Sequence, residues 1–308
     1  MRTNCTWLIS FILMMPIAAN AIIKRHDRDD SDYVMDQTTH AYVVYWGCSA
    51  TLIHPQWLLT AAHCVRGFDG SGISTLSKVT IAGTEYSVTG SPYFHPEYRS
   101  VRRPSYDERI KDIALVKLSS PVLNVTPIPL YEGSQELNQP VEIWGFGHTG
   151  NGLSGQLQPC GSEPCSRTLR RGTNRVNRIT DHELFMTFDR PDDSDVTEFE
   201  AHIGGGDSGG PAFIWVDNQR YVAGVGSTAH FDFSDRIFKY GSMSVYERVS
   251  DNLDWIKAVM KNDYPGTYNG PLYPIGEESS GGGSFCIFGL LLLVLRKLLP
   301  RVNKAKKV

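Results

Sequence analysis

Short apolar runs separated by turn-forming residues recur along the central part of this chain, a pattern typical of β-strands. Residues 49–53 and 57–60 are two such runs, and the turn His54-Pro55-Gln56 between them predicts a strand hairpin. A third run, residues 113–116, directly follows Asp112 and predicts a buried strand with a carboxylate at its head. These runs indicate a fold built largely from short strands.

One helix is predicted close to residue 250. Leu253, Ile256 and Met260 recur at a spacing that places them near one face of a helix. Ser250 or Asp251 precedes them and supplies the N-cap. The composition of 308 residues, with 29 glycines, 14 tyrosines and 41% hydrophobic residues, suits a globular protein of short strands and many turns.

The first 21 residues have the character of a secretory signal peptide. Arg2 is followed by an apolar stretch over residues 7–17 and by the small-residue sequence Ala19-Asn20-Ala21. Signal peptidase is therefore an expected partner, and cleavage after Ala21 leaves Ile22 as the new N-terminus. The protein is expected to be exported, to the cell surface or the medium.

Composition changes again after the predicted helix. Residues 263–284 are rich in Pro, Gly, Tyr and Ser and predict a linker. The segment 285–308 begins with the apolar run 285–295 and ends in basic residues. That run is shorter than the roughly 20 residues that span a bilayer comfortably, and its basic end is expected to stay cytoplasmic.

The stretch from Gly204 to Pro211, Gly-Gly-Gly-Asp-Ser-Gly-Gly-Pro, is the most informative candidate for chemistry. A serine hydroxyl is a poor nucleophile, and it needs a base for its proton and donors for the oxyanion that forms. Glycines around Ser208 allow a tight turn whose N–H groups are accessible to a substrate. Asp207 beside it requires a positive partner if it is buried.

His63 is the candidate base, because it follows the predicted hairpin and is adjacent to Cys64. A disulfide between Cys48 and Cys64 would stabilise the fold by roughly 3 kcal/mol and would restrain His63. Asp112 is the candidate acid that orients the imidazole. Asp107 lies in a polar stretch without an apolar continuation and is interpreted as a solvated loop residue.

Three motifs now occur in the order histidine, aspartate, serine: Thr60-Ala61-Ala62-His63-Cys64, Asp112-Ile113-Ala114-Leu115 and Gly206-Asp207-Ser208-Gly209-Gly210-Pro211. Together they resemble the motifs of the chymotrypsin/trypsin family of serine endopeptidases, over about residues 22–262. The resemblance implies an all-β domain of two packed six-stranded antiparallel β-barrels with a C-terminal α-helix.

The resemblance also implies roles. Ser208 attacks the scissile carbonyl, His63 moves the proton and Asp112 orients the imidazole, with an acyl-enzyme intermediate. The backbone N–H groups of Gly206 and Ser208 form the oxyanion hole. Protein or peptide substrates are expected, and no cofactor or metal is implied.

In this family a newly cut N-terminus enters the protein, and its ammonium pairs with the aspartate before the serine. Here the pair is Ile22 with Asp207, so that removal of the signal peptide itself creates the activating end. Lys24 and Arg25 depart from the glycines that the family has at these positions. The alternative is that Lys24-Arg25 is a processing site, which would leave His26 at the terminus.

The specificity pocket is where the sequence departs most from the family. His202 occupies the base of the pocket, six residues before Ser208, where trypsin-type enzymes carry an aspartate. It either packs or recognises an acidic side chain when protonated. Gly226 and Thr228 are expected on the wall strand that pairs with the substrate backbone.

The remaining cysteines of the exported domain, Cys160 and Cys165, are expected to form a second disulfide around a surface loop. A metal site there lacks further ligands nearby.

The C-terminal tail, with Gly281-Gly282-Gly283, resembles the Gly-Gly sorting signal of exported Gram-negative bacterial proteins, which implies a rhomboid-type sorting protease as a partner. The alternative is a short membrane anchor. The formal net charge of −3 gives no indication of nucleic-acid binding. A second function class remains open, a catalytically silent homologue that binds proteins through the same cleft.

Overall fold

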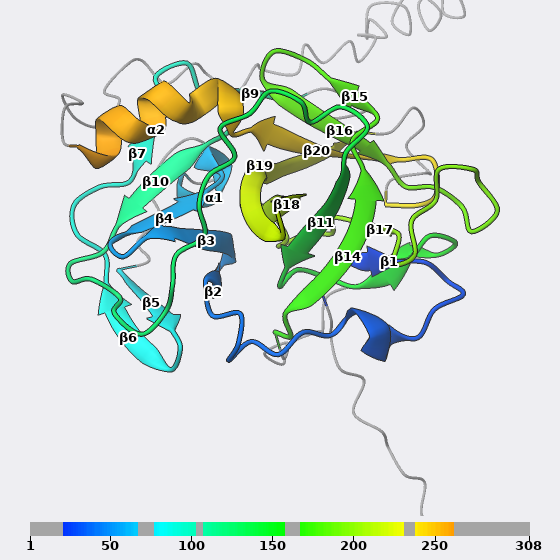
Figure 1. Cartoon of the computed structure of the whole chain (residues 1–308), viewed down its shortest axis with the longest axis horizontal. Coiled ribbons are helices and arrows are strands. Elements are labelled where there is room, and N and C mark those ends of the chain that lie inside the picture. Colours follow the sequence, from blue (N-terminus) through cyan, green and yellow to red (C-terminus); the bar gives the residue numbers. More distant parts are fainter. Residues whose placement is uncertain (1–20, 67–76, 103–106, 158–166, 231–237, 262–308) are drawn as a thin grey trace, which may run out of the picture. The chain divides into compact units, whose positions relative to one another are not determined.

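The computed structural model describes residues 21–66, 77–102, 107–157, 167–230 and 238–261. Within these residues the chain forms two β-structured halves that follow each other in sequence (Figure 1). The predicted linker, the C-terminal segment, Cys160, Cys165 and nearly all of the predicted signal peptide lie outside the described residues.

The first half contains a five-stranded antiparallel sheet in the order β2-β3-β4-β10-β7, together with the hairpins β5–β6 and β8–β9. Its elements are β2 (Val43–Trp46), β3 (Cys48–His54), β4 (Trp57–Thr60), α1 (Ala62–Val65), β5 (Lys78–Ile81), β6 (Thr84–Ser87), β7 (Tyr93–Phe94), β8 (Arg99–Arg102), β9 (Asp107–Ile110) and β10 (Ala114–Lys117). The predicted hairpin around His54-Pro55-Gln56 is confirmed as β3 and β4, and the predicted strand after Asp112 is confirmed as β10.

The second half contains a seven-stranded antiparallel sheet in the order β14-β11-β18-β19-β20-β16-β15. Its strands are β11 (Pro140–Gly145), β14 (Arg170–Arg175), β15 (Arg178–Ile179), β16 (Glu183–Thr187), β18 (Pro211–Val216), β19 (Gln219–His230) and β20 (Met243–Arg248).

A smaller four-stranded sheet has the order β13-β12-β1-β17, and its β1–β12 pair is parallel. Its strands are β1 (Ile23–Lys24), β12 (Gly150–Asn151), β13 (Gly155–Gln156) and β17 (Ala201–His202). A 3₁₀ turn, η1 (Asp30–Tyr33), follows β1.

The expected mostly-β, two-barrel-like architecture with a short C-terminal helix is confirmed, with the strands distributed over a five-stranded, a seven-stranded and smaller sheets.

Each end of the described chain packs on the half built by the opposite end. Near the N-terminus, β1 lies between β12 and β17. Near the C-terminus, α2 (Leu253–Met260) lies beside β7 and β10 (Figure 1), and its buried Trp255, Ile256 and Val259 join the core of the first half. β1 and α2 therefore connect the two halves of the domain through packing contacts.

The predicted N-cap of the terminal helix is wrong. Ser250 and Asp251 lie in a 3₁₀ turn, η3 (Ser250–Asn252), and α2 begins only at Leu253. The Ser250 hydroxyl donates instead to the buried carboxylate of Glu136, which draws it away from the helix. Within the described residues, no helix has the length and apolar character needed to cross a membrane.

Candidate active site

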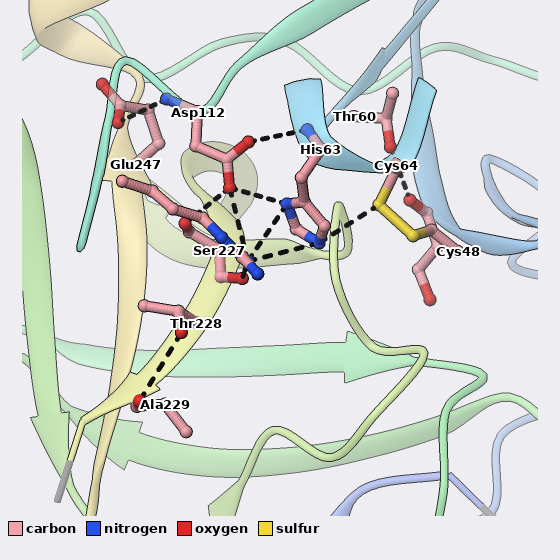
Figure 2. A network of polar contacts seen from close by, with 11 residues as sticks. Cys48, Thr60, His63, Cys64, Asp112, Ser227, Thr228, Ala229 and Glu247 are labelled. Atoms are coloured by element: carbon pink, nitrogen blue, oxygen red, sulfur yellow. Dashed lines mark hydrogen bonds and ion pairs between the residues drawn. A yellow bond between two sulfur atoms is a disulfide. The ribbon is translucent and has the colours of Figure 1, made fainter. Parts of the chain in front are cut away.

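His63 is held at the end of the β3–β4 hairpin by the single-turn helix α1, which begins two residues after β4. The predicted disulfide between Cys48 and Cys64 is confirmed, and it ties the start of β3 to the residue next to His63 (Figure 2). The imidazole is buried, with 4% of its surface exposed. The hairpin and the disulfide therefore determine where this ring points.

Asp112 is fully buried and accepts hydrogen bonds from both the ring and the backbone of His63. Its Oδ2 lies 2.7 Å from Nδ1, and its Oδ1 accepts the His63 backbone N–H at 2.9 Å. Burial alone would raise the pKa of this carboxyl. The charges and hydrogen bonds of His63, with Arg109 and the Ser227 hydroxyl, outweigh burial and lower the pKa to about 2. Asp112 is therefore ionised at neutral pH, with Nδ1 as the donor to it.

Ser227 is a third partner of this carboxylate, and sequence reasoning did not single it out. Its hydroxyl donates to Asp112 Oδ2 at 2.6 Å. The ladder between β19 and β20 has a register shift between Gly226 and Thr228, which leaves Ser227 without a Cα partner on β20. An irregularity of this kind re-aims a side chain. The sequence signal was a small polar residue directly after the apolar run Val222-Ala223-Gly224-Val225-Gly226.

Glu247 lies on the side of Asp112 away from His63 (Figure 2). Its Oε2 accepts the backbone N–H of Asp112 at 3.1 Å, and its Oε1 accepts the side-chain amide of Asn252 at 2.9 Å. Burial raises the pKa of Glu247 to about 8, so its carboxyl is largely protonated at neutral pH. It positions Asp112 without placing a second full negative charge beside it.

Ser208 lies in the glycine-rich turn and is tied by its neighbours to both other candidate residues. Its carbonyl accepts the N–H of Ser49, the residue after the disulfide-bonded Cys48, at 2.8 Å. The next residue, Gly209, donates its N–H to the carbonyl of Gly226 at 2.7 Å, directly before Ser227. The first hydrogen bond connects to His63 through the Cys48–Cys64 disulfide, and the second connects to Asp112 through Ser227. The turn that carries Ser208 is thus hydrogen-bonded to the segments next to Cys48 and Ser227, which contact His63 and Asp112 in turn.

The backbone N–H groups of the turn divide into two sets. Those of Gly204, Gly205, Asp207, Gly209 and Gly210 each donate a hydrogen bond within the protein. Those of Gly206 and Ser208 donate none to any residue that the structure describes. Gly206 has a φ of +93°, a conformation that favours glycine. These two N–H groups are the ones expected to bind a developing oxyanion.

Replacing Gly209 by alanine is expected to lower the free energy of unfolding by about 2–4 kcal/mol. Its φ is +78°, and an added Cβ would clash with the Thr60 hydroxyl and the Ser49 carbonyl. Gly83→Ala is the matched control, because Gly83 has a φ of +77° with nothing within 4 Å of the added atom. Urea unfolding of both variants measures the difference, and equal losses would contradict the close packing at Gly209.

Asp207 is buried under the turn and accepts three backbone N–H groups. Its Oδ1 accepts from Gly147 at 2.7 Å, and its Oδ2 accepts from Gly204 at 2.8 Å and from Ile22 at 3.2 Å. Ile22 is 1% exposed and packs in the core of the second half. Burial raises the pKa of Asp207 to about 7, and the three backbone N–H groups offset only part of this rise. While Ala21 remains attached, Ile22 offers Asp207 a neutral amide and no positive charge.

This raised pKa predicts a pH dependence of stability for the chain that retains Ala21. The folded state holds a proton on Asp207 that the unfolded state releases at its ordinary pKa of 3.8. The stability from this group is thus fully present below about pH 4 and is lost as the pH rises through about 7. Relative to Asp207→Asn, the free energy of unfolding is expected to fall by about 3 kcal/mol over that range.

Urea unfolding at several pH values, with the Ser208→Ala substitution present in both proteins, provides the measurement. A difference between the two proteins that stays constant with pH would contradict this assignment.

The candidate pocket residues behave differently from one another. His202 is fully buried between the rings of Phe188 and Phe238, and its Nδ1 donates to the carbonyl of Ile203 at 2.6 Å. Burial lowers the pKa of His202 to about 4, so the ring is neutral near pH 7. Gly226 is held in the turn network, and the Thr228 hydroxyl lies 3.5 Å from the Ala229 carbonyl. The geometry matches the packing interpretation of His202.

Comparisons with known proteins agree with this geometry. The family model described as Trypsin matches residues 31–256. Tryptase of Mus musculus is 30% identical over 244 residues, covering 71% of this chain and 81% of that protein. Snake venom serine protease serpentokallikrein-1 of Protobothrops mucrosquamatus is 28% identical over 216 residues, covering 69% of this chain and 76% of that protein.

The solved structure of neuropsin, a serine protease expressed in the limbic system of mouse brain, is similar in fold. Its TM-score is 0.53 at 20% sequence identity, and the match covers 74% of this chain and 98% of neuropsin.

Proposed function

The chain belongs to the trypsin family of serine endopeptidases, and we propose that Ser208, His63 and Asp112 carry its peptide-bond hydrolysis. The observation that carries the proposal is the buried His63–Asp112 contact of 2.7 Å, beside a turn with two N–H groups that donate to no described residue. Asp112 holds the Nδ1–H tautomer of His63. This leaves Nε2 as the base for the Ser208 hydroxyl.

In the proposed reaction the Ser208 oxygen attacks the scissile carbonyl while His63 takes its proton. The carbonyl oxygen becomes an oxyanion, which the N–H groups of Gly206 and Ser208 bind; one such donor is worth about 3–4 kcal/mol. His63 then passes the proton to the leaving amine, and an acyl-enzyme remains. Water then attacks the carbonyl of the acyl-enzyme while His63 takes a proton from it. His63 returns this proton to the Ser208 oxygen, and the second product is released.

The N-terminus at Ile22 is proposed to switch the enzyme on. In the uncut chain Ile22 has a φ of +64°, which is strained for a β-branched residue, and cutting before it removes that constraint. Its nitrogen already lies 3.2 Å from Asp207 Oδ2, so a released ammonium needs little movement to pair with it.

The alternative processing site at Lys24-Arg25 is bound within the folded protein. Arg25 is 8% exposed and binds both Asp27 and the carbonyl of Thr197.

Labelling with a serine-directed phosphonate tests the catalytic proposal. Folded protein that starts at Ile22 is expected to bind one label per molecule, and Ser208→Ala is expected to bind none. Folded wild-type protein that takes up no label would favour a silent homologue that binds proteins through the same cleft.

Export by signal peptidase and release by a rhomboid-type protease are proposed from the two terminal segments. The intact mass of the mature protein tests both steps. A mass that includes residues 285–308 would contradict removal of the sorting segment and would favour the short anchor. A mature chain with any other first residue would contradict the role of Ile22.

A further inference from the structure

The side chain of Arg109 lies inside the candidate active site. It comes from β9, three residues before Asp112, and is 7% exposed. Its Nη1 is 3.2 Å from Nδ1 and 3.4 Å from Nε2 of His63, so the guanidinium covers the imidazole. The same nitrogen donates to the carbonyl of Ser227, and it lies 3.7 Å from Asp112 Oδ2.

Two of these contacts use groups that hydrolysis requires. Nε2 of His63 must accept the proton of Ser208, and a guanidinium N–H nearby competes for the same lone pair. The carbonyl of Ser227 lies on the segment of β19 beside which a substrate strand is expected to pair by main-chain hydrogen bonds. Because Arg109 donates to the Ser227 carbonyl, this oxygen is already occupied and cannot accept a substrate N–H. In this arrangement the site is closed to a peptide until the guanidinium moves.

Electrostatics determines which substrates can move it. Arg109 gains from Asp112, so a neutral peptide that displaces it must offset that lost attraction without providing a new anion. During the reaction His63 also becomes positively charged, and a guanidinium on its face then repels it. A carboxylate on the substrate solves both problems, because it pairs with Arg109 as the side chain leaves the ring.

Arg109 belongs to the hairpin β8–β9, where Arg99 lies exposed on the neighbouring strand. The same hairpin carries Asp107 and Glu108, and Lys111 pairs with Asp251, so the preference for an acidic peptide comes from Arg109 itself and not from a surrounding basic patch.

We propose that Arg109 is a specificity-determining gate, which selects peptides with an acidic side chain within the three residues on the acyl side of the scissile bond. The proposal rests on the catalytic function proposed above. It assigns to Arg109 the acid selection that a buried, neutral His202 does not provide.

The test compares peptide pairs that differ only by Glu or Gln at each of the three acyl-side positions. The number of active sites is first counted by phosphonate labelling, so that absence of catalysis is separated from absence of selectivity. In the wild-type mature protein, kcat/KM is expected to be about tenfold higher for Glu at one position at least, the effect of about one favourable charge pair.

Arg109→Gln is expected to reduce this Glu/Gln ratio to about one, chiefly by raising kcat/KM for the Gln peptides, because the gate no longer has to be displaced by an anion. The same variant is expected to react faster than wild type with a phosphonate that carries no carboxylate. Arg99→Gln is the matched control, with the same charge change on the neighbouring strand, and is expected to retain the wild-type ratio.

Three results would overturn the proposal. The first is a wild-type protein that binds the label but has a ratio near one at all three positions. The second is an Arg109→Gln variant that keeps the wild-type ratio. The third is an equal loss of the ratio in Arg99→Gln, which would indicate a general surface charge effect. A merely structural role of Arg109 would lower the rates of both members of each pair together.

Discussion

Replacing Asp112 by asparagine is expected to lower kcat for peptide hydrolysis about 10⁴-fold, a magnitude taken from the corresponding substitution in this family. The carboxylate now accepts Nδ1 of His63 at 2.7 Å and the His63 backbone N–H at 2.9 Å. An asparagine side chain presents one oxygen and one NH₂ group. With its oxygen on the His63 backbone N–H, its NH₂ faces Nδ1 and imposes the tautomer in which Nε2 carries the proton. That nitrogen then cannot accept the proton of Ser208.

The measurement is kcat with a peptide that the wild-type protein cleaves, together with near-ultraviolet circular dichroism to confirm the fold. Asp107→Asn is the matched control, because Asp107 is the other acidic candidate in this part of the sequence. The interpretation of Asp107 as a loop residue is wrong, since it begins strand β9 and pairs with Arg102 of β8. Asp107→Asn is expected to retain activity within a few-fold of wild type. An equal loss in both variants, or a larger loss at Asp107, would contradict the assignment of Asp112.

A protein that begins at Ala21 is expected to be about 10²- to 10⁴-fold less active than one that begins at Ile22, because loss of one partner of a buried ion pair costs about 3–5 kcal/mol. With Ala21 attached, the nitrogen of Ile22 is a neutral amide, and burial holds the pKa of Asp207 near 7. With Ile22 free, an ammonium takes its place beside the carboxylate. The ionised Asp207 then stabilises the turn that carries Gly206 and Ser208.

The two proteins are prepared as fusions cut by a protease that leaves no extra residue, and N-terminal sequencing verifies their first residues. Activity is measured as the rate of phosphonate labelling and as kcat/KM on one peptide. Asp207→Asn in the protein that begins at Ile22 is expected to show a loss of the same order. Equal activity of the two starting points would contradict the proposed switch and would show that the turn forms without the ammonium.

Local sequence patterns predicted the elements whose contacts are local. The β3–β4 hairpin follows from two apolar runs around a proline-containing turn, and β10 follows from the buried run after Asp112. The Cys48–Cys64 disulfide was predicted because both cysteines flank that hairpin. In each case the information lies within a few residues of the element itself, so no knowledge of the other half of the protein was needed.

The helix N-cap shows where such reasoning stops. Ser250 has a suitable side chain in a suitable place, but the buried carboxylate of Glu136, more than one hundred residues earlier, takes its hydroxyl. The side chain of a cap residue can bond either to a local backbone N–H or to a distant acceptor that folding brings near. That acceptor is invisible in the local pattern, and the prediction of the helix start was wrong for this reason.

The sequence by itself determined the residue types of the candidate site and their order along the chain: His63, Asp112, Ser208, and the pair Ile22 and Asp207. Only the tertiary structure decided what surrounds them. Ser227 reaches Asp112 through an irregularity in the β19–β20 ladder, Glu247 accepts the Asp112 N–H from β20, and Arg109 covers His63 from β9. These contacts join residues between 46 and 135 positions apart in sequence. They depend on strand register and on side-chain direction in a shared core, and a one-dimensional pattern of polar and apolar residues encodes neither.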